Sequence, residues 1–295
     1  MKKFSALLKK CSICPRNCNV NRLKNELGFC KIGRNPKISS YNLHFGEEPP
    51  ISGVNGSGTI FFTGCNLRCV FCQNYPISQL HNGNEITISK LAGIMITLQN
   101  QNAHNINLVT PTHVVPQIIE TILAAKKKGL KLPVVYNSGG YEKIETLKSL
   151  EGIVDIYMPD AKYSNDNIAE RYSAAKNYLE INKAALKEMY RQVGNLQIKN
   201  GIATKGLLIR HLVLPKNIAG SRKVFEFIAK EISPKTYISI MAQYHPAAFG
   251  EPRLRRTNKT DDFPELRRKT TGKEYQQVLN WADELGFVNG WRQEL

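Results

Sequence analysis

Seven cysteines carry the strongest chemical signal in this sequence, and all of them lie at or before residue 72. The second group is Cys65, Cys69 and Cys72, with the spacing C-x3-C-x2-C, so three thiolates can turn toward one centre. Four thiolates would fill a cubane [4Fe–4S] cluster, one on each iron. Three leave one iron open, and the spacing therefore indicates a cluster that binds a small molecule.

The first group, here called the N-terminal cysteine group, has four members: Cys11, Cys14, Cys18 and Cys30. Four thiolates can close a site completely, as in a structural zinc site, or hold a full iron–sulfur cluster. Both zinc and a second cluster remain open from the sequence. A disulfide framework would spread an even number of cysteines through the chain, and isolated structural thiols would not fall into two tight groups.

The 295-residue chain carries 41 basic and 24 acidic residues, a formal net charge of +17. Such a charge attracts acidic partners such as nucleic acid, anionic lipid or an acidic protein, although it can also be a plain solvated surface. One basic stretch, 253–269, lacks the repeated aromatic residues that stack bases. An acidic electron-donor protein is therefore at least as good a partner as nucleic acid.

The N-terminal segment MKKFSALLKK begins like a secretory signal peptide. Its apolar run ends at Leu8, however, and two lysines follow with no small-residue cleavage site. No stretch approaches the roughly 18 apolar residues of a membrane span. We therefore expect a cytoplasmic protein that does not cross a membrane.

Short β-rich runs alternate with helical stretches beyond the turn-rich connector at 46–58. Strands are predicted at 59–63, 105–110, 132–137, 152–159, 206–215 and 236–244. Helices are predicted at 89–102, 116–128, 141–150, 167–194, 221–232 and 273–286, and the long pattern at 167–194 is either one helix or a broken one. This alternation predicts an α/β fold, a partial (β/α)6 TIM-type barrel with a parallel sheet and right-handed crossovers. We expect three regions: 1–52, cysteine-rich and metal-binding; 53–250, the partial barrel; and 251–295, a basic C-terminal segment with a terminal helix.

Ligands of such barrels bind at the carboxyl ends of the strands. The polar candidates there, besides the cysteines, are Thr110, His113, Asn137, Asp160, Lys162, Arg210 and His245. Each also has a structural explanation, such as a helix cap, a turn, a local ion pair or a satisfied interior histidine. His211 is left out because it should point to the opposite face of its strand from Arg210.

The loop TGCNLRCVFCQN at 63–74, with Phe71 before the last cysteine, resembles the radical S-adenosylmethionine (SAM) superfamily. Within it, the loop is most similar to activating enzymes of glycyl-radical enzymes. PDAKY at 159–163 resembles the Asp-x-Lys motif of that group, and Arg210 and Tyr244–His245 resemble positions that line its SAM pocket. The whole chain resembles an uncharacterised branch of pyruvate formate-lyase activating protein homologues, through strings such as HFGEEPPISG, HNINLVTPTH and VVYNSGGY.

The resemblance implies a [4Fe–4S] cluster on the three cysteines, whose open iron chelates SAM. An acidic donor such as flavodoxin or ferredoxin would reduce the cluster, and SAM would be cleaved to methionine and a 5′-deoxyadenosyl radical that abstracts hydrogen from a substrate. Phe71 would lie near adenine. Asp160, Lys162, Arg210 and His245 would position the methionine carboxylate and ribose, with Thr110, His113 and Asn137 as further candidates.

Two departures from the activating enzymes stand out. The Gly-Gly-Glu segment that holds the SAM amino group after the second strand is replaced by Thr110–His113. The better-known members also lack the N-terminal cysteine group. The resemblance implies no known substrate. The leading hypothesis is an enzyme that generates a radical on a protein or a small molecule, and activation of a glycyl-radical enzyme is its named version. The alternatives are a radical RNA-modifying enzyme, for which no spare cysteine remains, and a non-enzymatic metal-binding interaction protein.

Overall fold

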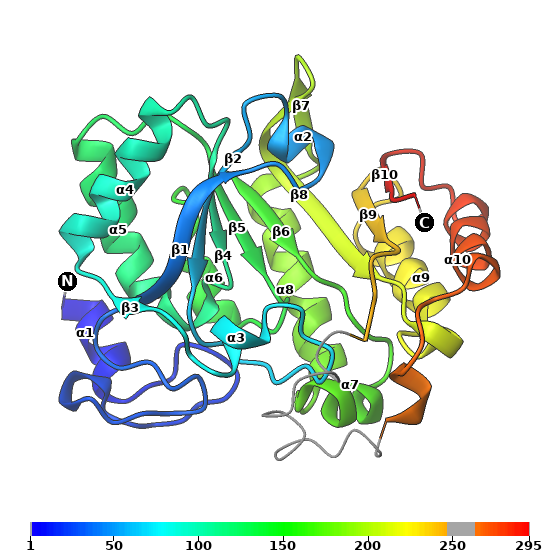
Figure 1. The fold of residues 1–295 in the computed structure, drawn as a ribbon, viewed down its shortest axis with the longest axis horizontal. Coiled ribbons are helices and arrows are strands. Elements are labelled where there is room, and N and C mark those ends of the chain that lie inside the picture. The colour runs from blue at the N-terminus through cyan, green and yellow to red at the C-terminus, as the bar shows by residue number, and fades with distance from the viewer. Residues whose placement is uncertain (1, 247–262, 295) are drawn as a thin grey trace.

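The computed structural model describes residues 2–246 and 263–294 (Figure 1). Six parallel strands stand side by side in chain order, and helices connect them. They are β2 (Ser57–Phe62), β4 (Ile106–Val109), β5 (Val134–Ser138), β6 (Ile156–Pro159), β8 (Ile202–Leu212) and β9 (Tyr237–Met241). This order confirms the predicted α/β partial barrel.

The connecting helices also fall where the apolar periodicity predicts them. They are α4 (Ile88–Asn100), α5 (Val115–Lys127), α6 (Ile144–Lys148), α7 (Asp166–Ser173), α8 (Tyr178–Val193), α9 (Ser221–Glu231) and α10 (Gly272–Glu284). The single pattern predicted at 167–194 is two helices, because Ala174 and Asn177 adopt left-handed backbone angles with φ of 51° and 52°. A left-handed residue interrupts a right-handed helix.

Four strands of the structure were not predicted. They are β1 (Lys37–His44), β3 (Asn84–Glu85), β7 (Gln197–Lys199) and β10 (Gly290–Arg292). β1 pairs antiparallel with β2, so part of the range assigned to the N-terminal region extends the main sheet. Only Ile38 of β1 is buried, and the strand therefore lacks the alternation of apolar residues that marks a half-buried strand.

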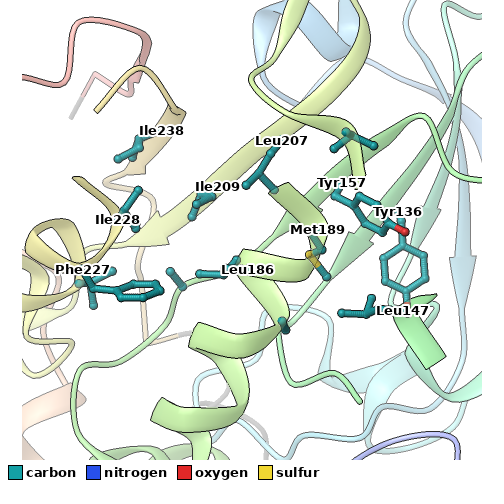
Figure 2. Close-up of a cluster of buried hydrophobic side chains, with 14 of the residues drawn as sticks. Tyr136, Leu147, Tyr157, Leu186, Met189, Leu207, Ile209, Phe227, Ile228 and Ile238 are labelled. Atoms are coloured by element: carbon teal, nitrogen blue, oxygen red, sulfur yellow. The ribbon is translucent and has the colours of Figure 1, made fainter. Parts of the chain in front are cut away.

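The largest core cluster lies between the sheet and the helices that cover its outer face. Figure 2 shows Tyr157 and Leu207 of the strands facing Leu186 and Met189 of α8. The strands are buried on both faces, as expected for a parallel sheet covered by helices. This packing fixes the positions of the strand ends.

The inner face of the sheet is closed at the amino ends of the strands by the short helix α2 (Pro49–Ser52) (Figure 1). Ile51 of α2 is fully buried and packs with Val135, Met158 and Leu208 from three strands. Helix α3 (Tyr75–Ser78) and the loops around it lie at the opposite end, where the strands finish.

No helix in the described part of the chain is long and apolar enough to cross a membrane. The basic residues Arg253, Arg255, Arg256 and Lys259 lie outside the described residues.

Glu142 makes the stability of the fold depend on pH. It is buried and accepts hydrogen bonds from Thr112 (2.6 Å) and Tyr136 (3.1 Å), and burial raises its pKa from 4.5 to about 7. The folded protein therefore binds this proton more tightly than the unfolded chain does. The resulting stabilisation is complete below pH 4.5 and is lost as the pH rises to about 7.

Compared with a Glu142→Gln variant, the wild type should therefore lose about 3 kcal/mol of unfolding free energy across that pH window. Anaerobic urea unfolding of both proteins at several pH values measures the difference, in which the other titrating groups cancel. A difference that stays constant with pH would contradict the assignment to Glu142.

Candidate functional site

The loop between β2 and α3, residues 63–74, is here called the cysteine loop, and its three thiols have polar neighbours. Ser173, at the end of α7, donates to the sulfur of Cys69 at 3.0 Å. The sulfur of Cys72 lies 3.2 Å from the hydroxyl of Ser78. The sulfur of Cys65 accepts a backbone N–H within the loop at 3.3 Å. Hydrogen bonds to thiolate sulfurs are typical of cluster-binding loops, where they tune the cluster.

Contacts from distant segments hold this loop in place. The backbone N–H of Val70 donates to the carbonyl of Tyr172 at 2.9 Å, which ties the loop to α7. The side-chain amide of Asn66 donates to the carbonyl of Tyr141 at 2.7 Å, which ties it to the segment after β5. The loop is therefore supported from two neighbouring strand ends.

The electrostatics of Cys65 and Cys72 fit a cationic cofactor. Burial, with the neighbouring Cys69, raises the pKa of Cys65 to about 12 and that of Cys72 to about 11. Thiolates in such surroundings require positive charge, which the irons of a cluster supply. Across the described residues, no three His, Cys, Asp or Glu side chains converge on a single ion. A cubane does not require this convergence, because each thiolate binds a separate iron.

Asp160 and Lys162 follow β6 and form an ion pair next to the cysteine loop. Burial alone would lower the pKa of Lys162, but Asp160 and Cys69 outweigh it and raise the pKa. The Lys162 backbone N–H donates to the hydroxyl of Tyr178 at 2.9 Å. Lys162 is thus a permanently charged group whose position is fixed at both its backbone and its side chain.

Arg210 lies on the inner face of β8, and His211 points to the outer face, where it bonds to Ser221 at 2.8 Å. Arg210 forms ion pairs with Glu47 (3.3 Å) and Glu48 (3.0 Å), which precede α2. Burial alone would lower the pKa of Arg210, but Glu48 and then Glu47 outweigh it and raise the pKa. A second partner of Glu47 is Asn107, whose amide donates to it at 2.9 Å.

Sequence reasoning did not single out these two carboxylates. Both belong to the string HFGEEPPISG, and two adjacent acidic residues before Pro49 and Pro50 were the available signal. Glu48 is fully buried, and burial raises the pKa of Glu47. Buried carboxylates of this kind are costly unless paired, which explains their position around Arg210.

Thr110 and Asn137 come together at the ends of β4 and β5. The Thr110 backbone N–H donates to the carbonyl of Asn137 at 2.8 Å. Thr110 has a φ of 60°, an uncommon value for a β-branched residue. Strained backbone of this kind concentrates at functional sites.

Phe71 is buried and meets Tyr244 edge to face, with 5.9 Å between ring centroids. The next residue, His245, is exposed, and it adjoins the segment 247–262 outside the described residues. His113 is buried, and its Nε2 lies 2.8 Å from the carbonyl of Thr63. His113 lines a cavity formed by the N-terminal cysteine group.

The structure therefore gathers two sets of candidates. The first set consists of the three cysteines and Phe71 of the cysteine loop, together with Asp160 and Lys162 beside it. Thr110 and Asn137 lie at the ends of neighbouring strands, and Arg210 lies inside the barrel. The second set is His113 and the N-terminal cysteine group. His245 belongs to neither set on the contacts described.

Comparison with known proteins shows the family to which this chain belongs. Residues 59–244 match the model of the radical SAM superfamily. The chain belongs to the radical SAM superfamily. Its members use a [4Fe–4S] cluster and SAM, and this protein is therefore a radical SAM enzyme. The match begins within β2 and ends at Tyr244, so it covers the partial barrel.

Individual relatives place the chain within this superfamily only broadly. It is 33% identical over 290 residues to the uncharacterized protein MJ0674 of Methanocaldococcus jannaschii, covering 95% of this chain and 76% of that protein. It is 23% identical over 170 residues to pyruvate formate-lyase 1-activating enzyme of Escherichia coli, covering 55% of this chain and 64% of that enzyme. The chain also aligns with HydG, a maturase of the [FeFe]-hydrogenase, at a TM-score of 0.49 and 12% identity, covering 77% of this chain and 48% of HydG.

Gly140 allows the segment after β5 to approach Asp160, and its substitution should be costly. Its φ is 69°, and a Cβ there would lie 2.2 Å from the Asp160 carbonyl oxygen. Gly129 also has a positive φ, of 94°, but a Cβ there would meet nothing within 4 Å. We expect Gly140→Ala to lower Tm by at least about 3 °C more than Gly129→Ala. Thermal scans of both variants measure this, and equal losses would show that the close contact is unimportant.

Proposed function

We propose that this radical SAM enzyme abstracts a hydrogen atom from a protein substrate, as the resemblance to activating enzymes of glycyl-radical enzymes implies. The carrying observation is the cysteine loop, whose three thiols lie beside a charged lysine at the carboxyl end of a parallel sheet. The similarity to pyruvate formate-lyase 1-activating enzyme supports a protein as the substrate. The net charge of +17 supports an acidic electron donor of the flavodoxin or ferredoxin class.

In this proposal the three loop cysteines each bind a separate iron and leave the fourth iron for SAM. When bound, the cluster supplies the electron that divides SAM into methionine and a 5′-deoxyadenosyl radical. Lys162, held by Asp160, would neutralise the methionine carboxylate. Phe71, which packs against Tyr244, would contact adenine with its ring.

The remaining residues would shape the site. Thr110 and Asn137 would present polar groups to the amino group of SAM, in place of the Gly-Gly-Glu segment that this chain lacks. Arg210 would support Asp160 from inside the barrel, since the two pair as neighbours across β6 and β8. A hydrogen atom leaves the substrate C–H bond for the 5′ carbon, which yields 5′-deoxyadenosine and a carbon radical on the substrate.

The substrate class can be tested with isotope transfer. Cells of the source organism are grown on glycine deuterated at its α carbon, and their extract is divided into macromolecules and a small-molecule filtrate. Each fraction is incubated anaerobically with the reconstituted enzyme, SAM and dithionite, and 5′-deoxyadenosine is examined by mass spectrometry. We expect deuterium in 5′-deoxyadenosine from the macromolecular fraction.

Two treatments of that fraction act as matched controls. Protease should abolish the transfer of deuterium, whereas ribonuclease should leave it unchanged. Loss of the signal with ribonuclease would favour the RNA-modifying alternative. Deuterium transfer from the filtrate alone, or from neither fraction, would reject a glycine residue of a protein as the source of the hydrogen.

A further inference from the structure

The N-terminal cysteine group surrounds a small cavity that the mechanism above does not use. All four of its cysteines line this cavity, together with Arg16, Arg22 and His113. Its volume is about 10 Å³, which is room for about one water molecule. The thiols therefore face a shared space below the barrel rather than scattering through the core.

Backbone groups are already directed at three of the four sulfurs. The N–H donors to Cys14, Cys18 and Cys30 come from Arg16, Phe29 and Ile32 respectively. Such a frame of N–H groups around clustered cysteines is what a metal centre needs to hold its thiolates.

Two arginine side chains at the cavity have donors left without acceptors. Arg22 is only 1% exposed, and it donates through Nε to the carbonyl of Gly33 (2.9 Å) and through Nη1 to that of His113 (2.6 Å). Its Nη2 is buried and has no hydrogen-bond partner, and the same is true of Nη2 of Arg16. Buried donors of this kind are rare, and a missing ion or group commonly explains them.

These unpaired donors favour an iron–sulfur core over zinc. A zinc ion draws four sulfurs to about 2.3 Å from one point and brings no hydrogen-bond acceptor of its own. An iron–sulfur core separates the thiolates and adds inorganic sulfides, which accept hydrogen bonds. Among the described residues the cysteine side chains do not converge on a point that would hold a single metal ion, and the Nη2 groups of Arg16 and Arg22 provide the donors.

The N-terminal cysteine group also lies against the cysteine loop. Arg16 donates through Nε to the carbonyl of Asn66 at 2.8 Å, and Arg68 donates to that of Phe29 at 2.7 Å. A Cβ on Gly64 would lie 2.6 Å from the carbonyl oxygen of Cys30, so the two backbones touch. Residues directly adjoining both cysteine sets are thus in contact.

We propose that the N-terminal cysteine group holds a second iron–sulfur cluster, which exchanges one electron with the cluster of the cysteine loop. A low-potential donor protein of the flavodoxin or ferredoxin class gives one electron to the N-terminal cluster. The reduced N-terminal cluster passes that electron to the oxidised cluster of the cysteine loop and returns to its oxidised state. The site does not depend on the protein substrate proposed above, although the electron exchange rests on SAM cleavage at the loop.

The metal content of a variant that lacks the loop ligands tests the site. Wild type and the triple variant Cys65→Ala, Cys69→Ala, Cys72→Ala are reconstituted anaerobically with iron and sulfide in the presence of zinc. Iron, acid-labile sulfide and zinc are then counted per chain, and far-UV circular dichroism checks folding. We expect the triple variant to lose about four irons and four sulfides, and to retain a second, sulfide-containing set of about two or four irons.

Zinc without sulfide in the folded triple variant would overturn the proposal. If that variant fails to fold, the wild type decides, because a total of only about four irons accompanied by one zinc would overturn it equally. Loss of SAM cleavage from a wild type that holds both clusters would instead count against the function of the loop. The two failures are therefore distinguishable.

Magnetic interaction between the two reduced clusters can be measured by EPR spectroscopy. The EPR spectrum of dithionite-reduced wild type should be broadened by spin–spin interaction relative to the summed spectra of the triple variant and of a Cys11→Ser, Cys14→Ser variant. A wild-type spectrum equal to that sum would reject electron exchange between neighbouring clusters. In the triple variant, Arg22→Gln should lower the reduction potential of the remaining cluster, because it removes a hydrogen-bond donor that stabilises the more negative reduced state. Arg34 is exposed, and Arg34→Gln should leave the potential unchanged.

Discussion

Alanine at Cys65, Cys69 or Cys72 is expected to reduce formation of 5′-deoxyadenosine by about 100-fold or more. In the proposed site each thiolate would hold one iron of the SAM-binding cluster, and the remaining two thiolates could not replace it because each would already bind its own iron. The assay is anaerobic incubation of the reconstituted protein with SAM and dithionite, followed by chromatography of 5′-deoxyadenosine.

The cysteine loop offers a matched control for these variants. Asn74 is exposed in the same loop, and its side chain caps no helix. Asn74 reaches the sulfur of Cys72 only through its backbone N–H, which alanine retains. Asn74→Ala should therefore keep wild-type activity. Full activity in any of the three cysteine variants would mean that the loop is not the cluster site.

The chemistry of the cysteine loop was predictable because its signal is local. Three cysteines within eight residues act together wherever the chain places them, and Phe71 adds a family signature. The six parallel strands were equally predictable, because a parallel sheet covered by helices produces short apolar runs such as Ile106–Val109. Local spacing and local apolar runs were therefore enough to predict most of the fold and the superfamily to which the chain belongs.

The contacts that complete the site were not predictable, because closure of the barrel makes them. Arg210 meets Glu47 across 163 residues, and Ser173 reaches Cys69 across 104. Nothing in the local sequence around either acceptor indicates its donor. His113 illustrates the same limit. Its position after β4 predicts a SAM contact, which stays a prediction, whereas its place beside Arg22 and the N-terminal cysteine group could not be foreseen from the sequence.

Strand β1 was missed for a different physical reason. A strand with one buried residue has little apolar surface to reveal it, and β1 is stabilised by pairing with β2 and, at its start, with β3. Strand β1 matters for the site because it follows Cys30 and links the N-terminal cysteine group to the sheet. The two cysteine groups are therefore brought together by a strand whose sequence gives no strand signal.

Lys162→Met is expected to raise the KM for SAM by about 10- to 100-fold, with a smaller effect on kcat. In the proposed site Lys162 binds the methionine carboxylate, and a charge-assisted hydrogen bond contributes about 1.5–3 kcal/mol. Methionine keeps much of the length and apolar stem of lysine but removes the charge, which also leaves Asp160 without its partner. Initial rates of 5′-deoxyadenosine formation at a series of SAM concentrations separate KM from kcat.

Two controls separate a role of Lys162 in SAM binding from an effect of charge or of cluster loss. Lys131 is exposed at the opposite end of the sheet, just before β5, so Lys131→Met controls for loss of one positive charge from the molecule. Iron content of Lys162→Met must match the wild type, because Lys162 also lies near the cluster thiolates and its loss could weaken the cluster instead. A raised KM with a full cluster assigns Lys162 to SAM, whereas a lowered iron content with unchanged KM assigns it to the cluster and contradicts the proposed role.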